Sequence, residues 1–347
     1  MHGKEIESAA FHERIQPALV EEGFKMHDYW IWGMSVLKGD EGLYHGFAAR
    51  WSKEVPFGPN WVTNSEIVHA TAEHPEGPYT FRSVVFERRG PDFFDGMMMH
   101  NPTIHKYGDT YLLFYTGSTY AFPYPNKEIT QKMYAEARLN QRIGMATAKS
   151  LWGPWARSDE PILNPREGRW DTIMTTNPAV CVRPDGRILL VYKSSEQHRG
   201  GKLKLGAAEA KHLGQPFVRL RDEPIFQFED SDKHVEDPYI WWNGQQYELL
   251  MKDMNGKICG VSGGGIHATS DNGIDWKISD PALAYRKTVA FDDGTTLKFV
   301  KFERVQVLVE AGKPTHLFFA VGINQKGKKG EDLSALVETW NLSLPLE

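Results

Sequence analysis

The stretch His100-Asn-Pro-Thr-Ile104, which leads into Tyr111-Leu-Leu-Phe-Tyr-Thr-Gly117, contains the pattern that decides the fold. A polar residue or a glycine followed by a short apolar run recurs along the 347 residues at steps of 60 to 76 residues. Most copies then pass through a Gly-containing turn into a second apolar run, which indicates a β-hairpin because glycine readily adopts positive φ. The five copies are residues 33–36, 101–104, 177–180, 237–240 and 304–307.

A second, alanine-containing pattern follows each of the first four copies and keeps step with them. Its copies are residues 69–72, 145–148, 207–210 and 267–270. Each repeat is therefore several strands long, and one such unit cannot bury both of its faces alone. Five units predict an all-β fold, a five-bladed β-propeller. The alternative is a pair of β-sandwiches.

Two segments depart from the strand pattern. Residues 4–22 predict a short amphipathic helix, so we expect a helical extension over residues 1–23 and a catalytic propeller over residues 24–347. That helix could pack on its own propeller or on a neighbour, which leaves a homo-oligomer open. Residues 126–140 predict a helical insertion, and we expect the insertions at 56–64 and 121–141 to wall the central funnel.

Composition excludes several classes of protein. Hydrophobic residues at 41% and charged residues at 24% exclude a disordered chain. No apolar run approaches the roughly 18 residues of a membrane span, and a net charge of −5 argues against nucleic-acid binding. Two cysteines make no disulfide scaffold. The chain as given has no secretory signal, and a removed signal would place it outside the cytoplasm, so localisation stays open.

The leading residues of the repeats are the candidate site, because the first strand of each propeller blade lines the channel. Each could instead be a simple turn former. Carboxylates beside aromatic rings indicate glycoside cleavage, in which one acid protonates the leaving oxygen and a second carboxylate activates water. The expected catalytic residues are Asp28, Glu236, Asp237 and Glu303. The expected substrate-binding residues are Trp32, His100, Asn101, Asp171, Asn177, Lys193, Trp241 and Arg304.

These motifs, together with His234-Val-Glu-Asp-Pro-Tyr-Ile-Trp241, resemble the five-bladed propeller glycosidases of glycoside hydrolase family 43 and its relatives, including family 117. The resemblance covers residues 24–322. It implies an inverting hydrolase with Glu236 or Glu303 as the acid and Asp237 as a positioning carboxylate. Family 43 has a catalytic aspartate where this chain has Gly33, so the nearest carboxylate, Asp28, is our candidate base.

We therefore expect an exo-acting, inverting hydrolase whose partner is an oligosaccharide. The alternatives are a phosphorylase, which needs one carboxylate and a basic phosphate cradle, and a carbohydrate-binding propeller without catalysis. Lys193 and Arg304 could contact an acidic sugar, while Asp171 could equally cap a loop. No cofactor is required and no catalytic metal is expected, although a ring of carboxylates would suit a structural Ca²⁺ or Mg²⁺ in the channel.

Overall fold

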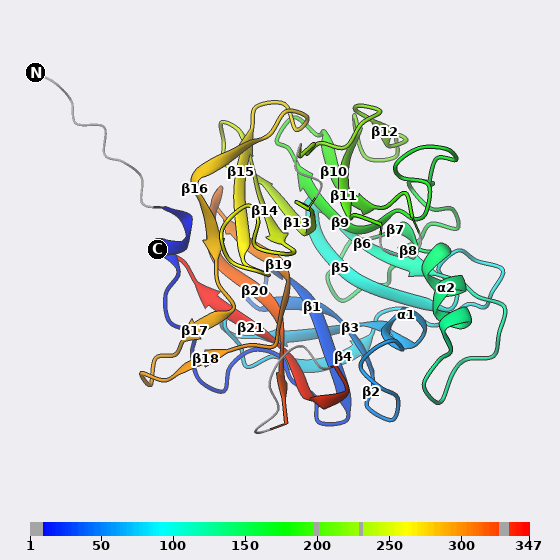
Figure 1. Ribbon diagram of the computed structural model, residues 1–347, viewed down its shortest axis with the longest axis horizontal. Helices are drawn as coiled ribbons and strands as arrows, with labels where there is room; N and C mark the ends of the chain where they lie inside the picture. Colours follow the sequence, from blue (N-terminus) through cyan, green and yellow to red (C-terminus); the bar gives the residue numbers. More distant parts are fainter. Residues whose placement is uncertain (1–9, 198–200, 229–231, 326–332) are drawn as a thin grey trace, which may run out of the picture.

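Five antiparallel β-sheets surround a central channel in the computed structural model, which describes residues 10–197, 201–228, 232–325 and 333–347 (Figure 1). The first strand of each sheet contacts the first strands of the two neighbouring sheets, so these five strands form the inner wall of a closed ring. The predicted five-bladed β-propeller is confirmed.

The strands of each blade follow one another in sequence order, and each pairs antiparallel with the next. Blade one contains β1 (Tyr29–Lys38), β2 (Tyr44–Ser52), β3 (Glu66–Ala72) and β4 (Thr80–Val84). Blade two contains β5 (Met98–Tyr107), β6 (Thr110–Ser118), β7 (Arg142–Ala148) and β8 (Ala156–Arg157). Blade three contains β9 (Thr176–Val182), β10 (Ile188–Ser194), β11 (Lys204–Ala210) and β12 (Val218–Arg219). Blade four contains β13 (Val235–Trp242), β14 (Tyr247–Asp253), β15 (Gly265–Ser270) and β16 (Lys277–Tyr285). The hairpin of β17 (Thr288–Ala290) and β18 (Thr296–Lys298) precedes blade five, which contains β19 (Lys301–Glu310), β20 (Lys313–Asn324) and β21 (Leu336–Pro345).

Apolar side chains fill the spaces between blades. Phe114 of blade two and Leu190 of blade three, for example, lie in one buried cluster. Burying such residues removes apolar surface from water, which is the main force that holds the blades together. The ring closes where blade five meets blade one: the Ile31 N–H donates to Thr339 Oγ1 at 2.9 Å.

The first strand of every blade contains a β-bulge at the leading residue of the repeat. At that residue φ is positive, between 47° and 55°, and the register with the neighbouring strand shifts beside it. Such a β-bulge turns a side chain away from the regular alternation of the strand. The five bulge residues are Gly33, Asn101, Asn177, Asp237 and Arg304. Left-handed backbone favours Gly, Asn and Asp, which explains four of these residue types.

The N-terminal helix predicted over residues 4–22 is wrong where the structure describes it, and residues 4–9 lie outside the described chain. Only the short 3₁₀ turn η1 (Phe11–Arg14) is helical. Pro17 lacks an N–H and disfavours a continued helix. The segment is extended instead: the Gln16 N–H donates to Pro345 O and the Ala18 N–H to Ala290 O, both at 2.9 Å, so it packs on its own propeller.

Two helical insertions lie beside the channel. They are α1 (Trp61–Asn64) and α2 (Gln131–Leu139), and α2 confirms the helix expected over residues 126–140. Thr130 caps α2, because its hydroxyl accepts from the Met133 N–H at 3.3 Å. Figure 1 shows the two helices close to each other at one edge of the propeller. No helix within the described ranges is long and apolar enough to cross a membrane.

Candidate active site

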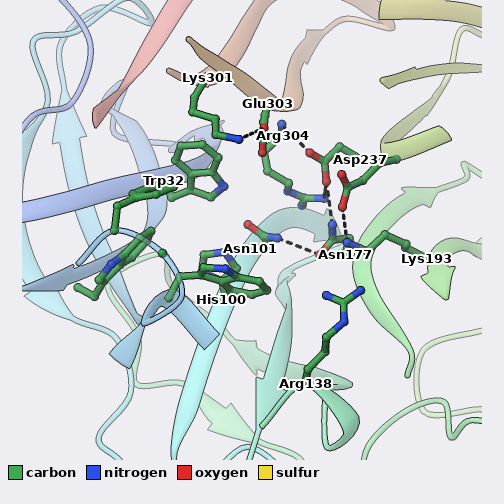
Figure 2. Close-up of a pocket in the computed structure, with 15 residues that line it drawn as sticks. Trp32, His100, Asn101, Arg138, Asn177, Lys193, Asp237, Lys301, Glu303 and Arg304 are labelled. Carbon is green, nitrogen blue, oxygen red and sulfur yellow. Dashed lines mark hydrogen bonds and ion pairs between the residues drawn. The ribbon is translucent and has the colours of Figure 1, made fainter. Parts of the chain in front are cut away.

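A pocket of about 160 Å³ opens at one end of the channel (Figure 2). Every blade contributes a residue at its bulge or immediately before it, as the leading positions of the repeat predicted. The insertions contribute to the wall, as expected, through α1, α2 and the loop before α1. The lining residues are Trp32, Trp51, Phe57, Gly58, Trp61, His100, Asn101, Arg138, Asn177, Lys193, Glu236, Asp237, Lys301, Glu303 and Arg304.

The bulge residues form the floor of this pocket through a chain of hydrogen bonds. Asn101 Nδ2 donates to Asn177 Oδ1 at 2.9 Å, and Asn177 Nδ2 donates to Asp237 Oδ1 at 2.7 Å. The Arg304 N–H donates to Asp237 Oδ2 at 3.0 Å. Gly33 occupies the fifth position and adds no side chain. The floor is thus a ring that is hydrogen-bonded on one side and open at Gly33.

Lysines hold both glutamates of the pocket in the ionised form. Lys193 Nζ lies 2.5 Å from Glu236 Oε1, and Lys252 Nζ and Lys301 Nζ lie 2.9 and 3.2 Å from Glu303 Oε1. Burial alone would raise the pKa of Glu303, but the two lysine charges outweigh it and bring the pKa to about 2. Burial is likewise outweighed at Glu236, whose pKa the charges of Lys193 and Lys252 lower.

The pKa of Asp237 shifts in the opposite direction. Its side chain is buried, and burial together with the nearby charge of Glu236 raises the pKa of Asp237 above its ordinary value. Both of its oxygens accept hydrogen bonds within the floor. The pocket therefore contains three carboxyl groups in different electrostatic environments, which is an arrangement suited to acid–base chemistry.

Aromatic rings form one wall of the pocket. Phe57 makes an edge contact with Trp32, with ring centroids 5.0 Å apart, and Trp61 of α1 lies 4.9 Å from the His100 ring. Burial lowers the pKa of His100 well below its ordinary value, so this imidazole is neutral. Its Nδ1 lies 2.8 Å from the Ser65 hydroxyl. Flat rings beside hydrogen-bonding groups suit the apolar face and the hydroxyls of a sugar.

The sequence reasoning missed several residues of the site. Trp51, Lys252 and Lys301 were not expected there, and Phe57 and Arg138 were expected only as parts of the insertions; four of these five line the pocket and Lys252 pairs with Glu303. A signal existed for Lys252: Lys193 on β10 reaches the glutamate of the next blade, and Lys252 on β14 repeats this one blade later.

The expectation that Asp28 lies in the funnel is wrong. Its side chain is 81% exposed and lies outside the pocket, with Oδ1 2.6 Å from Nδ1 of the exposed His27. The cause is its place in the chain: β1 begins at Tyr29, and the strand enters the pocket only at Trp32, next to the bulge.

Replacing Asp28 by Asn should accordingly change turnover by less than about twofold, which is the usual size of an exposed substitution. The check is kcat/KM on any substrate that the wild-type chain cleaves. A loss of a hundredfold would mean that Asp28 reaches the reacting atoms after all.

Asp171 and Trp241, expected at the substrate, lie elsewhere. Asp171 is buried, accepts from the Tyr192 hydroxyl at 2.8 Å and pairs with Arg166 and Arg219. Blade two repeats this cluster, since Asp95 accepts from the Tyr115 hydroxyl at 2.6 Å and pairs with Arg89. Both aspartates therefore stabilise their blades and do not line the pocket.

Trp241 lies at the opposite end of the channel. It shares a second, mainly apolar cavity with the later halves of the first strands, including Ile104, Val180 and Val307. The strand β13 crosses the molecule from one cavity to the other, and Trp241 comes four residues after its bulge at Asp237. The length of β13 therefore places Trp241 at the opposite end of the channel.

The polar end of the channel does not fit the Ca²⁺ or Mg²⁺ that the sequence left open. The floor ring offers a single carboxylate, Asp237, and places the Arg304 guanidinium beside it, with Nη1 3.6 Å from Oδ1. Hard divalent cations need several oxygen ligands and no neighbouring positive charge. Within the described ranges, no three His, Cys, Asp or Glu side chains come together as metal ligands.

Fold and pocket together define a five-bladed β-propeller with buried carboxylates at one channel mouth. No family model matches the chain, and no curated protein matches it. Several solved structures do match the chain. A family 117 glycoside hydrolase of the marine bacterium Zobellia galactanivorans is 14% identical, with a TM-score of 0.64 over 95% of this chain and 89% of that one.

Two further structures cover nearly the whole chain as well. An α-L-arabinofuranosidase from Podospora anserina, solved with cellotriose, is 13% identical, with a TM-score of 0.61 over 96% of this chain and 95% of that one. A thermostable family-43 glycoside hydrolase is 11% identical, with a TM-score of 0.57 over 94% and 91%. The resemblance to families 43 and 117 is thus confirmed for the fold.

Proposed function

We propose that this chain is a glycoside hydrolase that releases a single sugar from the end of an oligosaccharide with inversion at the anomeric carbon. The observation that carries the proposal is the convergence of Glu236, Asp237 and Glu303 in one pocket with an aromatic wall. The named glycoside hydrolases that share the fold support it.

Glu303 is the general base in this proposal. A base must be ionised before it can accept a proton from water, and with a pKa of about 2 Glu303 is ionised at any ordinary assay pH. Lys252 and Lys301 hold its carboxylate from two sides, which fixes its orientation.

Glu236 is the general acid. Lys193 is its hydrogen-bonding cation and lines the pocket, where a bound substrate can compete for it. If Lys193 turns to the substrate, burial and the negative charge of Glu303, which raise the pKa of Glu236, are opposed mainly by the charge of Lys252, and protonation of Glu236 becomes easier. Asp237 keeps the positioning role, since both of its oxygens are bound in the floor.

The shape of the pocket supports exo action. Residues from all five blades line it, and Trp61 of α1 and Arg138 of α2 stand at its wall. In Figure 2 the Arg138 side chain extends from α2 toward the cavity. A chain can therefore enter end first, whereas a continuous polysaccharide would need an open groove.

The direct test is a panel of oligosaccharides incubated with the full chain and followed by mass spectrometry, with proton NMR of the first product anomer. We expect one sugar to be released per event, with the anomer opposite to that of the substrate. Retention of configuration, or products cut from the chain interior, would contradict the inverting or the exo part respectively.

A phosphorylase is the second candidate, because Arg138, Lys193, Lys301 and Arg304 give the pocket one more cation than carboxylates. Such an enzyme attacks the anomeric carbon with phosphate in place of water. The same mass-spectrometric panel with and without inorganic phosphate separates the two: sugar phosphates would identify a phosphorylase, and free sugar in both arms a hydrolase. A binding propeller would give no product in either arm.

A further inference from the structure

The Arg304 guanidinium is a buried charge without a hydrogen-bond partner. Its side chain is 1% exposed and lines the pocket, and Nε, Nη1 and Nη2 have no hydrogen-bond partner among the described residues. Asp237 is the nearest counter-charge, at 3.6 Å, and it is already engaged in the floor. A buried guanidinium with one ion pair at 3.6 Å and no hydrogen bond is poorly compensated, which favours a further partner that the chain does not supply.

Gly33 and Asn101 border the Arg304 side chain. A Cβ placed on Gly33 would lie 3.6 Å from Cβ and Cγ of Arg304 and 3.0 Å from Asn101 Oδ1, so these two side chains already occupy most of the space that a side chain of blade one would need. Asn101 Oδ1 is also buried and without a hydrogen-bond partner in the described chain. Arg304 and Asn101 both line the pocket, which therefore contains arginine donors and an amide oxygen that have no hydrogen-bond partner among the described residues.

The charge balance favours an anion in this pocket. Lys193, Lys252 and Lys301 pair with Glu236 and Glu303, so the charges of the two glutamates are already matched. Arg138 adds a further guanidinium, which has no ion pair within the described residues and extends toward the cavity in Figure 2. Together with Arg304, five cationic side chains thus lie in or next to the pocket with three carboxyl groups.

We propose that Arg304 binds a carboxylate carried by the sugar itself, so that the substrate class is an oligosaccharide ending in a uronic acid. The planar guanidinium of Arg304 can donate two parallel hydrogen bonds to a carboxylate. Asn101 Oδ1 then accepts from a neighbouring hydroxyl. This inference rests on the proposed function in one respect, namely that the pocket takes a sugar.

The test measures binding, using calorimetric titration of the full chain with D-glucuronate and D-galacturonate, each against its neutral parent, D-glucose or D-galactose. We expect each uronate to bind at least about tenfold more tightly than its parent, as a charged hydrogen-bonded pair allows. Titration with inorganic phosphate is the third arm. Phosphate binding without any preference for uronates would overturn the sugar-borne carboxylate in favour of free phosphate.

Gly33 offers a matched pair of variants. In Gly33→Asp a carboxylate of the chain itself lies beside the Arg304 side chain and competes for its guanidinium, so the preference for uronates should fall sharply. In Gly33→Asn the shape is the same and the charge is absent, so more of the preference should remain. The backbone suits both residues, since Asn101 and Asp237 have φ of 50° and 52° at equivalent bulges, and the Asn101 side chain has to shift slightly to admit a Cβ 3.0 Å from its Oδ1. Equal uronate preference in both variants would overturn the proposal.

If both Gly33 variants fail to fold, Arg138→Gln and Lys132→Gln replace them, because both residues lie on α2 and only Arg138 lines the pocket. The preference for uronates should fall in the first and persist in the second; no change in either overturns the proposal. A chain that prefers uronates yet cleaves nothing contradicts only the hydrolase function. Hydrolysis confined to neutral sugar ends contradicts only the anion site.

Discussion

Replacing Glu303 by Gln is expected to lower kcat/KM by about 10²- to 10⁴-fold, the usual contribution of a general base. The amide keeps the size of the side chain but cannot take a proton from water. The loss should be equally large for every substrate, because water must be activated whatever the leaving group. Initial rates on a cleaved oligosaccharide and on a matching aryl glycoside measure it.

Glu236→Gln should behave differently on the same two substrates. A general acid matters when the leaving oxygen needs a proton, so the loss should be large, again about 10²- to 10⁴-fold, for the oligosaccharide. An aryl glycoside with an acidic phenol leaves without help, and its turnover should be much less affected. Equal losses on both substrates for both variants would contradict this assignment of acid and base.

Each variant also removes a counter-charge from a buried lysine, so folding must be checked independently. Lys252 is buried and pairs with Glu303, and its ammonium would face a neutral amide in Glu303→Gln. Unfolding midpoints in urea distinguish a catalytic loss from a smaller folded fraction. If either variant is fully folded and turns over the oligosaccharide within about tenfold of wild type, that glutamate is not the acid or base.

The repeat predicted the fold and most of the pocket because each repeat forms one blade. Equivalent residues of the repeats therefore lie at equivalent positions around the central channel. Given the five leading positions, the convergence of Asn101, Asn177, Asp237 and Arg304 follows without knowledge of any loop. What the pattern could not show was the bulge, because the positive φ at each lead depends on pairing with the neighbouring strand. That bulge is the reason these side chains point into the pocket.

The errors have separate physical causes. Asp28 is close in sequence to Gly33, but the four strand residues between them carry it beyond the pocket. Trp241 has the aromatic character of a sugar-stacking residue, yet the length of β13 takes it to the other channel mouth. Arg138 lies on an insertion outside the repeat, where periodicity carries no information about which residue faces the site.

Asp171 shows how a buried carboxylate near a site can be mistaken for part of it. It lies six residues before the bulge at Asn177, and burial of an ionised carboxylate is costly without partners. The chain supplies three: Arg166, Arg219 and the Tyr192 hydroxyl. Since Asp95 has the same kinds of partner in blade two, the cluster belongs to the propeller repeat and not to substrate binding.

Asp171→Asn should therefore lower the free energy of unfolding by about 3 kcal/mol, the lower end for breaking a buried ion pair. The lower end applies because the side chains of Arg166 and Arg219 are 21% and 15% exposed and regain some hydration. Asp222→Asn is the matched control: it removes the other carboxylate partner of Arg166, which is 67% exposed, and should cost less than about 1 kcal/mol. Urea unfolding measures both. Because neither residue reaches the pocket, kcat/KM of the folded protein should be unchanged, and a folded Asp171→Asn variant that has lost activity would return this residue to the site.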